Sequence, residues 1–192
     1  MSIIIIMNIF CEENLKTPYF CELYTSLHRV LGGVIPVIVC IGTDAVAGDS
    51  LGPLVGSMLK DKLAGKTYIF GTVECPITAR DVTTVADFVK NAYPDVPILA
   101  IDAALGSKEE IGSIKILNKS IKPGLGVDKD LAEIGSASII GVVEERERGK
   151  RCLSTVRLSV VYTQAKFIAT EVERYVNSCS VKKYNVLNKV YR

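Results

Sequence analysis

The spacing of apolar residues changes near residue 34. Before that point, large apolar side chains recur every three or four positions, which is the spacing of one face of an α-helix. This pattern ends at Gly32-Gly33, a pair of residues typical of a helix terminus, and its members are Leu15, Tyr19, Leu23, Leu27, Val30 and Leu31. The first part of the chain therefore predicts an amphipathic helix.

From residue 36 onward, short apolar runs alternate with stretches of helical spacing. The runs over residues 37–41, 67–73 and 97–103 predict strands, and the almost wholly apolar first and third runs are typical of strands buried on both faces. Further strands are predicted over residues 113–118 and 138–144. The intervening and final helical faces carry Leu51, Leu54, Val55, Met58 and Leu63, then Val82, Val85, Val89 and Tyr93, then Leu158, Val161, Tyr162, Ala165, Ala169, Val172 and Val176. This alternation predicts an α/β three-layer sandwich, with a mostly parallel sheet and helices on both faces.

The chain divides into three predicted parts. Residues 1–33 form an N-terminal arm and helix, residues 34–178 an α/β domain, and residues 179–192 a basic tail that contains no acidic residue. The arm includes the run Ile3-Ile4-Ile5-Ile6, which is too short to span a bilayer and lacks the features of a secretory signal. Three interpretations of the arm stay open: an edge strand, an interaction arm, or an upstream start before Met7.

Composition removes several classes of function. With 192 residues, 48% hydrophobic residues and a mean hydropathy of +0.29, the chain has the composition of a folded domain. A net charge of +2 gives no basic footprint for nucleic acid, and no membrane partner is expected. The six cysteines include no CxxC pair, so a zinc knuckle or redox motif is not expected, and reduced thiols predict a cytoplasmic protein.

The chain contains a single histidine, His28, which lies on the first predicted helix. Catalysis that depends on histidine and metal sites rich in histidine are therefore not expected, and no cofactor is expected. Carboxylates become the first candidates for chemistry.

Four carboxylates follow the predicted strands. Asp44 and Asp49 come after the first strand, Glu74 after the second, and Asp102 at the end of the third, directly after the apolar residues 98–101. In parallel sheets, ligands bind outside the carboxyl ends of the strands, so these side chains are expected along one crevice.

Asp49 and Asp102 are the strongest candidates. Asp102 directly follows a run of apolar residues expected to be buried, so its carboxyl is expected to be partly desolvated, which favours its neutral form. If the two carboxyls face each other, their pKa values must separate, so that one acts as a base on water while the other donates a proton to a substrate carbonyl. The structural alternatives are that Asp49 caps the following helix and that Asp102 caps a turn.

Other motifs fit less well. Gly42, Gly48 and Gly52 do not form GxGxxG, no P-loop lysine is present, and the segment around Ser50 is not GxSxG. Cys75 follows an acid, which raises a thiol pKa rather than lowering it. The glycine-rich stretch over residues 119–135 has the length of a lid or binding wall, although an ordinary connection is an equal alternative.

Four segments together carry a resemblance to a known family. They are Cys40-Ile41-Gly42-Thr43-Asp44, Gly48-Asp49-Ser50-Leu51-Gly52-Pro53, Ile101-Asp102-Ala103-Ala104-Leu105-Gly106 and Lys122-Pro123-Gly124-Leu125-Gly126-Val127. In this order and spacing the chain resembles, from about residue 34 to residue 178, the YyaC-type spore protease family. That family is similar to the germination protease of endospore formers and, more distantly, to the hydrogenase maturation endopeptidases.

The resemblance implies a phosphorylase/hydrolase-like fold and an aspartic-type peptidase with Asp49 and Asp102 as its two functional acids. Asp102 would be the base or the partner that shares the proton. Asp44, Glu74, Gly124 and Gly126 would bind or position substrate. The hydrogenase peptidases hold nickel through acids at the two aspartate positions and a later loop histidine, which residues 123–130 of this chain lack.

The leading hypothesis is therefore a sporulation-linked peptidase in the forespore or spore core, acting on small acid-soluble or other spore proteins. The alternatives are a noncatalytic sporulation protein that binds a protein partner through the same crevice, and a metal-dependent maturation peptidase. Assembly of several copies stays open.

Overall fold

A six-stranded sheet forms the centre of the computed structural model, which describes residues 5–8, 22–122, 133–146 and 153–179. The strands lie in the order β1-β5-β6-β4-β2-β3. Strands β3, β2, β4 and β6 are parallel, whereas β5 runs antiparallel to both β6 and β1. The strands are β1 (Ile5–Asn8), β2 (Val37–Cys40), β3 (Ile69–Phe70), β4 (Ile98–Gly106), β5 (Ser113–Leu117) and β6 (Ala137–Glu145).

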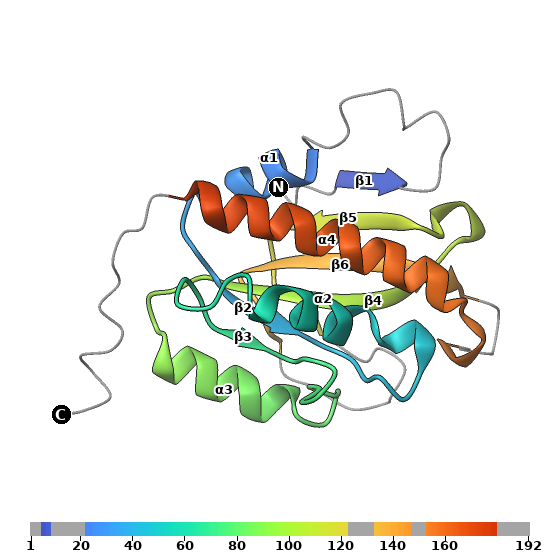
Figure 1. Cartoon of the computed structure of the whole chain (residues 1–192), viewed down its shortest axis with the longest axis horizontal. Coiled ribbons are helices and arrows are strands. Elements are labelled where there is room, and N and C mark those ends of the chain that lie inside the picture. The colour runs from blue at the N-terminus through green and yellow to red at the C-terminus, as the bar shows by residue number, and fades with distance from the viewer. Residues whose placement is uncertain (1–4, 9–21, 123–132, 147–152, 180–192) are drawn as a thin grey trace.

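Helices cover both faces of this sheet (Figure 1), as the apolar pattern predicts. The α-helices are α1 (Glu22–Leu31), α2 (Leu51–Lys60), α3 (Val82–Ala92) and α4 (Leu158–Ser178). Three short 3-10 helices join them: η3 (Ala47–Asp49), η4 (Lys108–Glu110) and η5 (Leu153–Thr155). The four predicted helices are confirmed, although Leu15 and Tyr19 of the first lie outside the described residues. Helix α1 ends at Leu31 and is followed by Gly32, where φ is +63°, a conformation that suits glycine.

Two differences from the predicted strands matter for the site. The second predicted strand is reduced to the two residues of β3, at the edge of the sheet. The third strand, β4, continues to Gly106, well beyond the predicted end at residue 103. The isoleucine-rich arm contributes the edge strand β1, which confirms one of its three interpretations. The division of the chain into arm, domain and tail stays a prediction.

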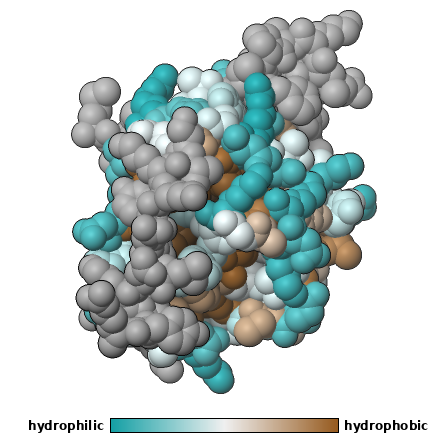
Figure 2. Space-filling model, turned by 60° about the vertical axis from the view of Figure 1, so that its left-hand side comes forward, coloured by the Kyte–Doolittle hydropathy of each residue, from teal (hydrophilic) through white to brown (hydrophobic). Residues whose placement is uncertain are grey.

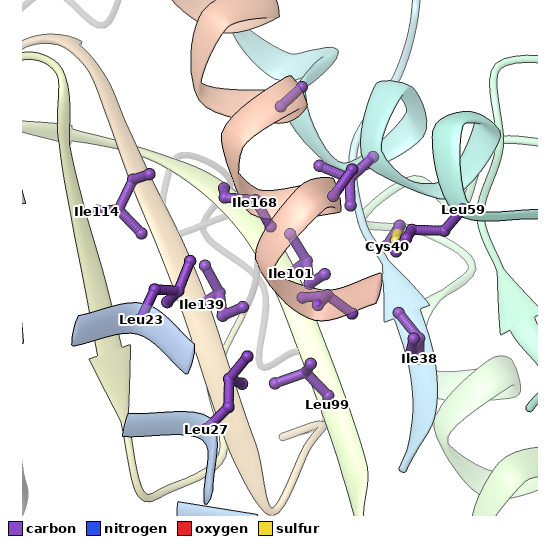
Figure 3. Packing of buried hydrophobic residues seen from close by; sticks show 14 of the residues in the cluster. Leu23, Leu27, Ile38, Cys40, Leu59, Leu99, Ile101, Ile114, Ile139 and Ile168 are labelled. Carbon is purple, nitrogen blue, oxygen red and sulfur yellow. The ribbon is translucent and has the colours of Figure 1, made fainter. Parts of the chain in front are cut away.

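The sheet separates two hydrophobic clusters because successive strand residues point to opposite faces. Ile38 and Cys40 of β2 pack into the larger cluster with α1, α2 and α4, part of which is drawn in Figure 3. Val37 and Val39 pack on the other side, where α3 contributes Val82 and Val89.

Glycines let α2 approach the sheet closely. A side chain at Gly52 would overlap with the Ile41 carbonyl, and one at Gly56 would overlap with the Gly71 carbonyl. Gly71 itself has φ +86° and lies against the Cys40 carbonyl. The start of α2 is therefore held directly over the carboxyl end of β2, which fixes the residues that precede it.

Some hydrophobic surface remains exposed. Hydrophobic side chains are visible between hydrophilic ones on the face that Figure 2 shows. Among the described residues, the large hydrophobic side chains that stay exposed are those of Tyr68, Phe88, Leu158 and Tyr162. No described helix has the length and the apolar character needed to cross a membrane.

Candidate active site

Asp102 lies inside β4, not after it. Its predecessor Ile101 pairs with Cys40, the last residue of β2, while Asp102 pairs with Ile140 of β6. From this point β4 continues with β6 as its paired neighbour, because β2 has turned away into the loop that leads to η3. Asp102 therefore lies within its strand, as the predicted strand over residues 97–103 has it, but the prediction that this strand ends at residue 103 is wrong. The residue still lies at the carboxyl end of β2, where a crevice is expected.

The Asp102 side chain is 8% exposed, and its Oδ1 accepts a hydrogen bond of 2.8 Å from the Ala103 backbone N–H. This contact lies within the strand, so the turn-capping alternative for Asp102 is also wrong. The other carboxyl oxygen can carry a proton.

Asp49 is the last residue of η3 and lies in a tightly packed loop. The Thr43 N–H donates to the Asp49 carbonyl over 3.1 Å, and Gly42, with φ +136°, lies so close that a side chain there would overlap with the same carbonyl. The helix cap position is taken by Ser50, whose Oγ donates to the Ala47 carbonyl. Asp49 therefore does not cap α2, and its half-buried carboxyl is available for chemistry.

Burial changes the acidity of both carboxyls. It raises the pKa of Asp49 to about 6, although the Thr43 backbone N–H opposes this rise by favouring the ionised form. Burial, and after it the negative charge of Asp49, raise the pKa of Asp102 to about 7, although the hydrogen bond from the Ala103 N–H opposes this rise. The charge of Asp49 acts on Asp102, so the two predicted catalytic residues are within electrostatic reach of each other.

The raised pKa values give the pair a definite arrangement of charge. Near neutral pH Asp49 is mostly ionised, whereas Asp102, with the higher pKa, keeps its proton in a large fraction of the molecules. Such a pair can accept a proton from water through one carboxylate and donate a proton through the other.

The other predicted site residues lie differently. Asp44 is exposed in the loop after β2. The side chain of Glu74 is 69% exposed and forms an ion pair of 3.9 Å with Lys60, on the outer side of α2. No described contact joins either residue to the aspartate pair. Gly124 and Gly126 lie outside the described residues.

No local sequence pattern predicts that η5 packs against the turn that carries Asp49. A side chain at Gly48 would meet the Leu153 carbonyl at 2.6 Å and Val156 Cγ2 at 2.7 Å, so η5 and the residue after it pack against the turn that carries Asp49. These residues lie more than 100 positions apart along the chain, and no local pattern links them.

Metal ligands do not gather in the part of the chain that the structure describes: it contains no group of three His, Cys, Asp or Glu side chains suited to an ion. His28 lies on α1, where its ring contacts Tyr24 and Tyr175 and its Nε2 lies 3.0 Å from Ser178 Oγ. Among the described residues the two aspartates thus have no third ligand of the kind used by a nickel site built from two acids and a histidine.

Comparisons with known proteins agree with this fold. A family model described as "Protein of unknown function (DUF1256)" matches residues 11–171. The chain is 36% identical over 148 residues to a protein of Bacillus subtilis (strain 168) described as "Uncharacterized protein YyaC", which covers 77% of this chain and 72% of the relative. A solved structure, the [NiFe] hydrogenase maturation protease HycI from Thermococcus kodakarensis KOD1, resembles it with a TM-score of 0.51 and 19% identity, covering 79% of this chain and 99% of that one. This likeness confirms the α/β sandwich.

Proposed function

The chain belongs to the DUF1256 family, and from this premise together with its aspartate pair we propose that it is a peptidase that hydrolyses peptide bonds of other proteins. The observation that carries the proposal is the pair itself: two carboxyls, one buried and one half-buried, whose pKa values are raised to about 7 and about 6. Strongly shifted acids at the carboxyl ends of parallel strands are typical of functional sites.

The order of the two pKa values suggests the roles. Asp49 is the more acidic group and would be the base, while Asp102 would hold the proton, which is the second of the two roles expected for it. Ionised Asp49 takes a proton from water as the water oxygen bonds to the substrate carbonyl carbon, and Asp102 protonates the carbonyl oxygen. Asp49 then passes its proton to the amide nitrogen as the C–N bond breaks, and Asp102 recovers a proton from a hydroxyl of the intermediate.

The finer parts of the proposal rest on the family resemblance. A spore protein, such as a small acid-soluble protein, is the proposed substrate, and the forespore or spore core is the proposed location. The similarity to a Bacillus protein supports a spore-forming context, although the printed name of that relative states no activity.

The test is cleavage of an extract of small spore proteins by the full chain. We expect Asp49→Asn and Asp102→Asn to reduce the rate at least 100-fold, the usual effect of removing a general acid or base. Asp87→Asn is the matched control, because Asp87 is exposed on α3 and undergoes the same chemical change. The rate should show a bell-shaped pH profile with limbs near pH 6 and pH 7. Equal cleavage by wild type and both site variants would refute the proposal.

A further inference from the structure

The beginning of α4 is attached to the loop that carries Asp49. The Leu153 carbonyl and Val156 pack against Gly48, and α4 starts at Leu158, two residues after Val156. In Figure 1 the first turns of α4 lie beside η3 and the beginning of α2. The first turns of α4 therefore border η3, the turn that carries Asp49, while its last turns lie at the opposite end of the sheet.

The apolar stripe of α4 loses its cover at this end. Leu158, Ala165, Ala169 and Val176 recur at helical spacing and so lie on one face of α4. Ala165 is fully buried, and Ala169 and Val176 are at most 2% exposed, but Leu158 is 56% exposed. Tyr162, one turn after Leu158, is 50% exposed.

The other two exposed hydrophobic residues have aromatic neighbours. The ring of Phe88 lies 6.0 Å from that of Phe70, and the ring of Tyr68 lies 5.0 Å from that of Tyr93. Tyr162 makes no ring contact within the described residues. Leu158 and Tyr162, which we call the apolar shelf, are thus adjacent apolar groups without a described cover, at the end of α4 that borders the catalytic pair.

We propose that the apolar shelf is a specificity site that binds a large apolar side chain of the polypeptide substrate beside the aspartate pair. This inference rests on the proposed function, because a peptidase must hold its substrate on the surfaces that adjoin its catalytic groups. The shelf is joined through Val156 and η5 to the turn that carries Asp49, which favours the substrate as its occupant. Covering two adjacent apolar side chains on binding favours Leu, Ile, Met or Phe over polar residues at the matching substrate position.

The experiment measures binding separately from cleavage. The full chain carrying Asp102→Asn, which is not expected to cleave, is titrated against fluorescein-labelled ten-residue peptides that differ only in a central Leu or Ser, with anisotropy as the signal. We expect the Leu peptide to bind about tenfold more tightly. Adding Leu158→Ser or Tyr162→Ser should remove most of this preference, whereas Phe88→Ser, which alters an equally exposed residue on α3, should preserve it.

Four outcomes overturn the inference. Peptide binding without a Leu preference, or a preference that survives both shelf variants, means that the shelf does not contact substrate. A change in sedimentation on substitution means that a second copy covers it, and a large loss of thermal stability means that this chain's own residues cover it. If the wild type does not cleave spore proteins, the proposed function fails. The Leu preference in the binding experiment would still stand, so the two failures can be told apart.

Discussion

Replacing Asp102 by Asn should make the protein more stable at neutral pH. The folded state holds Asp102 with a pKa of about 7, compared with an ordinary value of 3.8, mainly because the side chain is buried. A carboxyl whose pKa is raised on folding stabilises the folded state fully below the unfolded value, and this stability is lost as pH rises toward the folded value. Asn has no proton to lose, and its Oδ1 can still accept the Ala103 N–H.

The size of the effect follows from the two pKa values. The interval between 3.8 and about 7 corresponds to about 4 kcal/mol at about 1.4 kcal/mol for each pH unit, and relaxation around the charge reduces this figure, so we expect roughly 2–4 kcal/mol. The advantage of Asp102→Asn over wild type should be absent near pH 4, grow up to pH 7, and then level off.

The assay is urea unfolding at several pH values between 4 and 8. Far-UV circular dichroism is the appropriate signal because the chain contains no tryptophan. Asp87→Asn, at an exposed position on α3, is the control and should follow the wild type at every pH. If the difference between Asp102→Asn and wild type is the same at pH 5 and pH 8, Asp102 is not a buried acid that keeps its proton, and the reasoning on the site fails with it.

Three further changes test the packing of the fold. Gly56→Ala should lower the free energy of unfolding by about 1–3 kcal/mol, although alanine favours helices, because the new methyl group overlaps with the Gly71 carbonyl; urea unfolding measures it, and a stabilised variant would contradict it. Glu171→Gln should raise the melting temperature at pH 8. Burial raises the pKa of this carboxyl, and one of its oxygens has no hydrogen-bond partner. An unchanged or lower melting temperature would contradict this prediction. Tyr175→Phe should lower stability by about 1 kcal/mol through loss of the 2.8 Å hydrogen bond to the Val34 carbonyl, and equal urea midpoints for variant and wild type would exclude that contribution.

Local patterns were sufficient to predict most of the fold. The apolar runs of β2 and β4 and the helical spacing in α4 report burial directly, because burial on two faces or one face imposes different periods. The strand lengths could not be predicted in this way. β4 extends to Gly106 because β6 pairs with it along its whole length, and this pairing depends on residues about 40 positions away.

The position of the candidate site, like the strands themselves, could be predicted from local patterns, but its members could not all be told apart. Asp49 and Asp102 follow from the rule that places ligands at the carboxyl ends of parallel strands. That rule also drew attention to Asp44 and Glu74, which come after strands in sequence but remain exposed in the structure. Asp49 and Asp102 differ from Asp44 and Glu74 in being covered by residues distant in sequence. For Asp49, this cover includes α2 and η5, which pack on the loop after β2.

The stability prediction and the proposed activity share one cause. Burial of Asp102 destabilises the folded protein above pH 4, and it also keeps a proton on that carboxyl at neutral pH, where a general acid needs one. A position that only supported the fold would be improved by Asn without any loss. If Asp102→Asn is both more stable and unable to cleave, the instability is tied to catalysis, as is common in enzyme sites. If the variant is more stable and its cleavage is unchanged, the buried acid has another role, and the peptidase proposal must be abandoned even though the description of the carboxyl is right.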